Sequence, residues 1–201
     1  MAETTALPHQ TLIGAAWPEG SLARPIRLAI LALAGSALLT LSAKVQVPMW
    51  PVPMTMQTFA VLTIGMAYGW RLGGATLLLY LAEGAIGLPV FSKGGGIAYF
   101  YSATSMGYIY GFVLAAVLVG WLAGRGWDRN PATTALAMLI GNIVIYVPGI
   151  LWLGMIVGWE GNPILEWGLY PFLVGDAIKL ALAAALLPLA WKAVRRWRDT
   201  S

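Results

Sequence analysis

Two charged residues lie close together in an otherwise apolar stretch near the end of the chain. Asp176 and Lys179 are three residues apart, a spacing that places both side chains on one face of a helix. If this stretch crosses a membrane, each charge costs about 3 kcal/mol to insert, so both are expected to face a cavity or each other. The pair therefore indicates either a ligand-binding site in the outer half of the membrane or a structural ion pair that closes a helix bundle.

Further polar residues interrupt other apolar stretches. Gln57 lies near the start of one of them, at a predicted depth similar to that of Asp176. A buried amide needs hydrogen-bond partners, so Gln57 is a candidate for ligand contact, with packing against a neighbouring helix as the alternative. Asn142 and Tyr146 are four residues apart and form another polar face, where hydrogen bonding between helices is the expected role of Asn142.

The sequence lacks the residue patterns of a catalytic or nucleotide-binding site. It contains no GxxxxGKS/T loop, no HExxH segment and no convincing nucleophile pattern. Without cysteine, and with His9 as the single histidine, a thiolate or histidine metal cluster is excluded. We therefore expect no enzyme activity, no metal site and no cofactor in this chain; an intramembrane enzyme using Asp176 as acid or base, and a structural assembly subunit, are the disfavoured alternatives.

The composition is that of a protein embedded in lipid. Hydrophobic residues make up 59% of the 201 residues and charged residues 10%, whereas a soluble domain carries about 25% charged residues. Six segments are apolar enough to be predicted as transmembrane helices: 26–43, 55–68, 72–85, 104–123, 132–157 and 171–193. A glycine-rich turn at 69–74 separates the second from the third. The predicted fold is an all-α membrane bundle over residues 25–198, preceded by a cytoplasmic tail, residues 1–24.

The distribution of basic residues predicts the orientation of this bundle. With both termini in the cytoplasm, Lys44 and Lys93 lie outside, Lys179 lies within a span, and every other Lys and Arg lies inside. This is the charge bias of cytoplasmic loops in membrane proteins. It accounts for the net charge of +4 without any nucleic-acid partner.

One outer loop, residues 84–96, is rich in both glycine and apolar residues. A flexible apolar loop beside the mouth of a bundle suits a lid over a small molecule, and an ordinary surface connection is the alternative. Gly87, Leu88, Pro89 and Lys93 are the predicted lid residues.

Small residues recur on one side of the first predicted helix, at Ala29, Ala32 and Ser36. Such residues let helices approach closely in lipid. They predict either packing within the bundle or a docking face for a partner membrane subunit.

Several segments together resemble the BioY-type biotin transporters. Residues 51–58, PVPMTMQT, are similar to the family's P-V-P-x-T-x-Q-T segment, and GAIGLPVF at 84–91 to its G-x-x-G-L-P-V-F stretch. GYIYGF at 107–112 and PFLVGDAIK at 171–179 resemble its G-Y-L-x-G-F and P-F-x-x-G-D-x-x-K stretches. The chain departs from the family at 102–108, where SATSMGY stands in place of a G-P-T-G-G-Y run, and Lys93 replaces a smaller or neutral polar residue.

The resemblance implies the substrate-binding subunit of an energy-coupling-factor importer in the inner (plasma) membrane. Such a subunit takes up biotin and works with a transmembrane coupling subunit and two ATPase subunits, which use the ATP. A subunit of the same architecture for another vitamin, such as thiamine, is the alternative.

The resemblance also implies roles for individual residues toward biotin. Asp176 would accept hydrogen bonds from the ureido N–H groups, and Lys179 would donate to the ureido oxygen or neutralise the carboxylate. Gln57 would add a polar contact. The apolar parts of the ligand would lie against three aromatic residues, since pockets of this kind have apolar walls: Tyr80, Phe91 and Tyr108.

Overall fold

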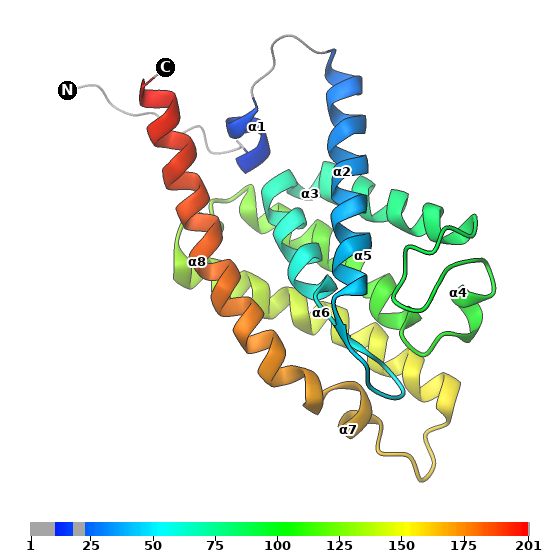
Figure 1. The fold of residues 1–201 in the computed structure, drawn as a ribbon. Helices are drawn as coiled ribbons and strands as arrows, with labels where there is room; N and C mark the ends of the chain where they lie inside the picture. The colour runs from blue at the N-terminus through cyan, green and yellow to red at the C-terminus, as the bar shows by residue number, and fades with distance from the viewer. Residues whose placement is uncertain (1–10, 18–22, 201) are drawn as a thin grey trace.

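The computed structural model of the 201-residue chain describes residues 11–17 and 23–200, and helices make up most of it (Figure 1). The long helices are α2 (Arg24–Lys44), α3 (Gln57–Ala85), α5 (Met106–Ala123), α6 (Pro131–Val157) and α8 (Tyr170–Thr200). The short elements are α1 (Leu12–Ala16), α4 (Tyr99–Ser102), α7 (Ile164–Gly168) and the antiparallel strands β1 (Gln46–Val47) and β2 (Met54–Thr55). The predicted helical character is confirmed, apart from this hairpin of two two-residue strands.

Long apolar helices make this a membrane protein. Within the described residues, four segments are long and apolar enough to cross a bilayer: Arg24–Lys44, Met106–Ala123, Pro131–Val157 and Ile164–Arg198. Many large apolar side chains on these helices point outward, among them Leu33, Leu151 and Ile178. An apolar surface of this extent is unfavourable in water and is the expected outer surface of a protein in lipid.

Helix α3 is divided by Gly69, whose φ of 78° and ψ of 171° interrupt the helical backbone. A positive φ of this kind is readily available to glycine alone. The two parts of α3 approach each other closely beside this break. A Cβ on Gly73 would lie 3.1 Å from Gly65 Cα. The break was predicted as a turn over residues 69–74, but the helix resumes at once after the single glycine.

Helix α5 occupies the centre of the bundle and packs mainly against α3 and α6. Glycines make these close contacts possible: a Cβ on Gly120 would lie 2.5 Å from Trp70 N, and one on Gly111 would lie 2.8 Å from Ile145 Cα. Helix α2 packs on α3, and α8 packs on α6 and α3. The arrangement places the start of α3, the start of α5, the middle of α6 and the start of α8 around one region of the core.

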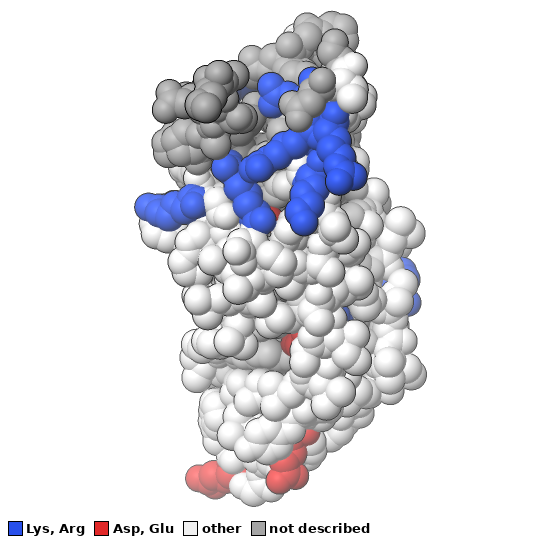
Figure 2. Space-filling view, turned by 90° about the vertical axis from the view of Figure 1, so that its left-hand side faces the viewer, with Lys and Arg blue, Asp and Glu red and all other residues white. Residues whose placement is uncertain are grey.

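The two ends of the molecule differ in charge. Figure 2 shows blue basic side chains gathered toward one end and red acidic side chains at the opposite end. The basic end is where α8 finishes, and the other end carries α7 (Figure 1). Lys192, Arg195 and Arg196 belong to the last turns of α8, and Glu160 and Glu166 belong to the connection before α8.

Two sequence predictions concern the first residues and α2. Part of the predicted tail forms helix α1, which packs against α3 and α8. Residues 1–10, which include His9, and residues 18–22 lie outside the described residues. Ser36 packs within the bundle, which is one of the two predicted alternatives, because its side chain is buried and Oγ donates a hydrogen bond to Glu83 Oε2. Ala29 is exposed and Ala32 is half-buried.

Candidate ligand-binding site

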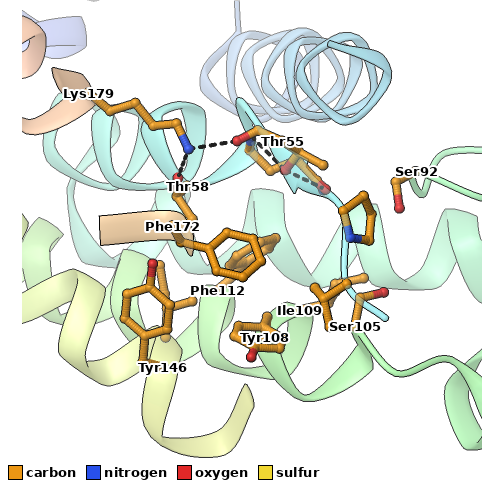
Figure 3. A pocket seen from close by; sticks show the side chains of 14 residues that line it. Thr55, Thr58, Ser92, Ser105, Tyr108, Ile109, Phe112, Tyr146, Phe172 and Lys179 are labelled. Atoms are coloured by element: carbon orange, nitrogen blue, oxygen red, sulfur yellow. Dashed lines mark hydrogen bonds between the residues drawn. The ribbon is translucent and has the colours of Figure 1, made fainter. Parts of the chain in front are cut away.

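A cavity lies where the loops at 51–55 and 92 meet the starts of α3, α5 and α8 (Figure 3). Its volume is about 40 Å³, which is room for about three water molecules. Its walls are mainly apolar, with polar groups at two places. The lining residues are Val52, Pro53, Thr55, Gln57, Thr58, Ser92, Ser105, Tyr108, Ile109, Phe112, Ile145, Tyr146, Phe172 and Lys179.

Lys179 ends in a complete set of hydrogen bonds at one side of this cavity. Its Nζ donates to Thr55 O at 2.8 Å, to Asp176 Oδ1 at 2.9 Å and to Thr58 Oγ1 at 3.0 Å. An ammonium group has three protons, so all of them are donated to the protein. The Thr55 and Thr58 contacts can be followed as dashed lines in Figure 3.

Asp176 is the acceptor at the centre of the same network. Its Oδ1 accepts from Lys179 and, at 3.1 Å, from Thr58 Oγ1, while its Oδ2 accepts from the Tyr146 hydroxyl. The residue is 5% exposed. Three donors, one of them a cation, satisfy the hydrogen-bonding capacity of this buried side chain.

The ion pair separates two hollow regions of the protein. Lys179 lines the cavity, whereas Asp176 lines an apolar groove of about 360 Å³ between α6 and α8. The outward-facing side chains of Ile143, Val147 and Leu173 form part of that groove. Asp176 therefore does not line the cavity itself. It is connected to the cavity through Lys179 and Tyr146, which line it and donate hydrogen bonds to the carboxylate.

Gln57 lines the cavity, and its side chain is held in place by a hydrogen bond to Tyr80. Its Nε2 donates to the Tyr80 hydroxyl at 2.9 Å, and that hydroxyl donates to Val90 O at 2.9 Å. Tyr80 is fully buried and does not line the cavity. The Tyr80 hydroxyl thus joins Gln57 to Val90 in the loop that follows α3.

Tyr108 lines the cavity with its aromatic ring, and Phe91 does not line it. The Tyr108 ring lies 6.1 Å from Tyr146 and 6.4 Å from Phe172, centroid to centroid, and its hydroxyl donates to Gly168 O at 2.8 Å. Phe91 is fully buried behind the cavity, with its ring edge-on to Tyr80 at 5.3 Å.

The predicted lid residues Gly87, Leu88, Pro89 and Lys93 are exposed and do not line the cavity. The residue of this loop that reaches the cavity is Ser92. The loop packs onto the bundle through its neighbours Val90 and Phe91, which are buried.

Several lining residues were not singled out from the sequence, although helical spacing pointed to some of them. Phe172 lies four residues before Asp176, and Phe112 lies four residues after Tyr108, so each pair shares a helix face. Tyr146 was recognised only as part of a polar face. Asn142, predicted to bond between helices, has a buried Oδ1 without a hydrogen-bond partner among the described residues.

The fold and this site define a helical membrane protein with a small, mainly apolar cavity beside a buried ion pair. The sequence profile of the BioY family matches residues 14–196, and the chain belongs to this family. The "Probable biotin transporter BioY" of Pyrococcus horikoshii is 39% identical over 151 residues, which cover 75% of this chain and 87% of that one. The "Biotin transporter BioY" of Thermotoga maritima is 32% identical over 151 residues, covering 75% and 88%.

A solved structure shares the fold. It is described as the S-component for biotin from an ECF-type ABC transporter, and it covers 89% of this chain and 95% of its own. The TM-score is 0.67 at 22% sequence identity. At this level of identity the likeness concerns the arrangement of the helices.

Proposed function

We propose that this chain takes up biotin across the plasma membrane as the substrate-binding subunit of an energy-coupling-factor importer. The observation that carries the proposal is the buried pair of Asp176 and Lys179 beside a small, mainly apolar cavity, in a chain of the BioY family. The relatives named as biotin transporters support biotin over other vitamins.

The chemistry of the site suits the ureido group of biotin, which offers two N–H donors and one oxygen acceptor. Lys179 is the donor to the oxygen. Asp176, which does not itself line the cavity, is the acceptor for the N–H groups once Thr58 or Tyr146 gives up its hydrogen bond to the carboxylate. Because all three Lys179 protons are donated within the protein, the ureido oxygen has to take the place of one acceptor, such as Thr55 O. Binding is then an exchange of hydrogen bonds, which leaves no charge unpaired.

The other walls of the cavity match the apolar part of biotin in character, although the cavity has to widen from about 40 Å³ to take the ligand. Tyr108, Phe112 and Phe172 present aromatic surface to it, and Gln57 contributes a polar contact from the start of α3. In this arrangement Tyr80 and Phe91 act from behind the wall, in contrast to the direct contact predicted from the sequence.

The proposed topology has six membrane spans over residues 25–198: α2, the two parts of α3, α5, α6 and α8. Both termini, with the tail 1–24, lie in the cytoplasm. The concentration of basic side chains at the end where α8 finishes supports this orientation (Figure 2).

Energy for uptake comes from partners in this proposal, because the sequence has no nucleotide-binding pattern. They are a transmembrane coupling subunit and two ATPases. The exposed face of α2 around Ala29, with Ala32 at its edge, is the proposed contact for the coupling subunit, since small residues permit close helix packing.

The test is calorimetric titration of biotin into the purified, detergent-solubilised chain. Tight binding by the chain, none by the Asp176→Asn, Lys179→Met double variant and unchanged binding by Lys93→Met would support both ligand and site. Lys93 is the matched control because it is exposed and outside the cavity. A folded chain that binds thiamine in a vitamin panel but not biotin would overturn the assignment.

A further inference from the structure

The outer loop 86–96, here called the lid loop, is fixed to the bundle at a few defined points. Tyr80 donates a hydrogen bond to Val90 O, and Gly96 N donates to Gly84 O at 2.7 Å. The Phe91 ring occupies a site that exists because Gly84 has no side chain, since a Cβ there would overlap the ring. Ser92, the next residue, lines the cavity.

One further point of attachment comes from α2. Lys44 is the last residue of this helix, and its Nζ donates a hydrogen bond to Phe91 O at 2.7 Å. A charged donor on a carbonyl oxygen makes a stronger hydrogen bond than a neutral one. Lys44 itself is exposed, so its ammonium group is available from solvent for exchange with another acceptor.

The Phe91 carbonyl is connected to the cavity through a short chain of contacts. The Phe91 ring packs edge-on against Tyr80, and the Tyr80 hydroxyl both accepts from Gln57 Nε2 and donates to Val90 O. Gln57 and Ser92 line the cavity. A displacement of Phe91 therefore alters two parts of the cavity wall together.

The cavity has to open for a ligand to enter. Its volume of about 40 Å³ is far below the several hundred Å³ (roughly 300–1,000 Å³) of ordinary small-molecule sites. The lid loop contributes Ser92 to the wall and has residues 86–89 and 93 exposed at the surface, so it is the part of the wall that the proposal takes to move.

We propose that Lys44 is a positioning residue that holds the lid loop closed, and so sets the rates at which the ligand enters and leaves. The proposal rests on the proposed function of the cavity. Lys44 lies outside the cavity, and the proposal takes its bond to Phe91 to be the same in the empty and the loaded closed forms. Loss of the bond then destabilises the empty closed form and the loaded closed form equally. Both rate constants rise by the same factor, and their ratio, the dissociation constant, is unchanged.

Two measurements on the purified full chain in nanodiscs test this inference. The first is hydrogen–deuterium exchange without ligand, in which Lys44→Met should speed exchange in residues 86–96 by about threefold to tenfold, the range for one ordinary net hydrogen bond, because this charged donor is exposed to solvent. Exchange in α5 should not change. Lys44→Arg, which keeps a cationic donor, should restore slow exchange, and Lys93→Met, on an exposed lysine of the same loop, should behave as the native chain.

The second measurement is stopped-flow fluorescence with biotin, in which Lys44→Met should raise the association and dissociation rate constants by the same factor, about threefold to tenfold. Unchanged exchange in the lid loop, or equally faster exchange in α5, would overturn the role of Lys44. A changed dissociation constant with unchanged rates of association would do the same. Faster exchange in a chain that binds no biotin would keep Lys44 as the residue that closes the loop and would reject the proposed ligand instead.

Discussion

Replacing Lys179 by methionine removes the cation from the buried ion pair and keeps an unbranched side chain. Asp176 then retains hydrogen bonds from Thr58 and Tyr146 but has no opposite charge beside it. Removing one partner of a buried pair costs about 3–5 kcal/mol, because a charge is left uncompensated in a poorly solvated place. The side chains of Lys179 and Asp176 are 11% and 7% exposed, so this range applies with little reduction by solvent. We expect Lys179→Met to lower the free energy of unfolding by about 3–5 kcal/mol.

Adding Asp176→Asn to that variant should restore part of the stability. The asparagine keeps an oxygen that accepts from Thr58 or Tyr146, and no buried charge remains at the site. The double variant then lacks hydrogen bonds but has no unpaired ion, which corresponds to a loss of about 1–3 kcal/mol. Asp176→Asn alone leaves the Lys179 cation with the oxygens of Thr55, Thr58 and the new amide, and should cost about 3 kcal/mol.

The four proteins form a double-mutant cycle, which isolates the interaction between the two side chains. Reversible unfolding in mixed micelles, followed by tryptophan fluorescence, gives the four free energies. A double variant that is more stable than Lys179→Met is the expected result. Losses that simply add would show that the charges do not interact in the folded protein, and the account of the pair as the centre of the site would fail.

Three further changes are expected to have distinct effects. Gly84→Ala should displace the Phe91 ring and lower the free energy of unfolding by about 1–3 kcal/mol, measured by thermal denaturation. Burial raises the pKa of the Asp128 carboxyl, against the hydrogen bond from Trp191 Nε1, so the folded chain holds this proton more tightly than the unfolded chain. Stability should therefore fall as the pH rises above the ordinary carboxyl pKa of 3.8, and Asp128→Asn should remove this dependence. Ala29→Trp should leave biotin binding unchanged and strongly reduce ATP-driven uptake in cells.

Each of these changes has a control or a contrary result. Gly124→Ala places a methyl group at ordinary contact distance, 3.4 Å from the nearest atom, and should be nearly neutral. A pH dependence that survives in Asp128→Asn would assign it to other groups. Normal uptake by Ala29→Trp would exclude the exposed face of α2 as the docking surface, whereas Ser36→Ala should affect stability, because Ser36 is bonded to Glu83 inside the bundle.

The long helices could be predicted because their signal lies in the sequence itself. Continuous apolar stretches, punctuated by glycine and proline, mark α2, α5, α6 and α8, and Gly69 marks the break in α3. The β1–β2 hairpin and the helices α1, α4 and α7 were not predicted. Elements of two to five residues are stabilised by the surfaces against which they pack. They are too short for a hydrophobic periodicity that would predict them.

The site could be predicted in part for a similar reason. Asp176, Lys179 and Gln57 stand out because polar groups are rare in apolar stretches, and the structure brings them to one region of the core. Aromatic residues carry no such signal, so nothing separated Tyr108, which lines the cavity, from Phe91, which supports it. The bond between Lys44 and Phe91 joins residues 47 positions apart, and such pairings are defined by the fold alone.

The groove between α6 and α8 has a consequence for the environment of the site. Asp176 lines this groove and Lys179 lines the cavity, so the thickness of one ion pair separates the cavity from the outer surface of the bundle. In a membrane that surface is covered by lipid acyl chains, which have a low dielectric constant and adapt their packing to temperature and chain length. The lipids in the groove are thus neighbours of the ion pair. How closely they pack there affects the local dielectric constant, and with it the attraction between Asp176 and Lys179. Measurements of affinity in detergent and in lipid bilayers should therefore differ for this protein, and bilayers of shorter or branched chains should shift the affinity without any change in sequence.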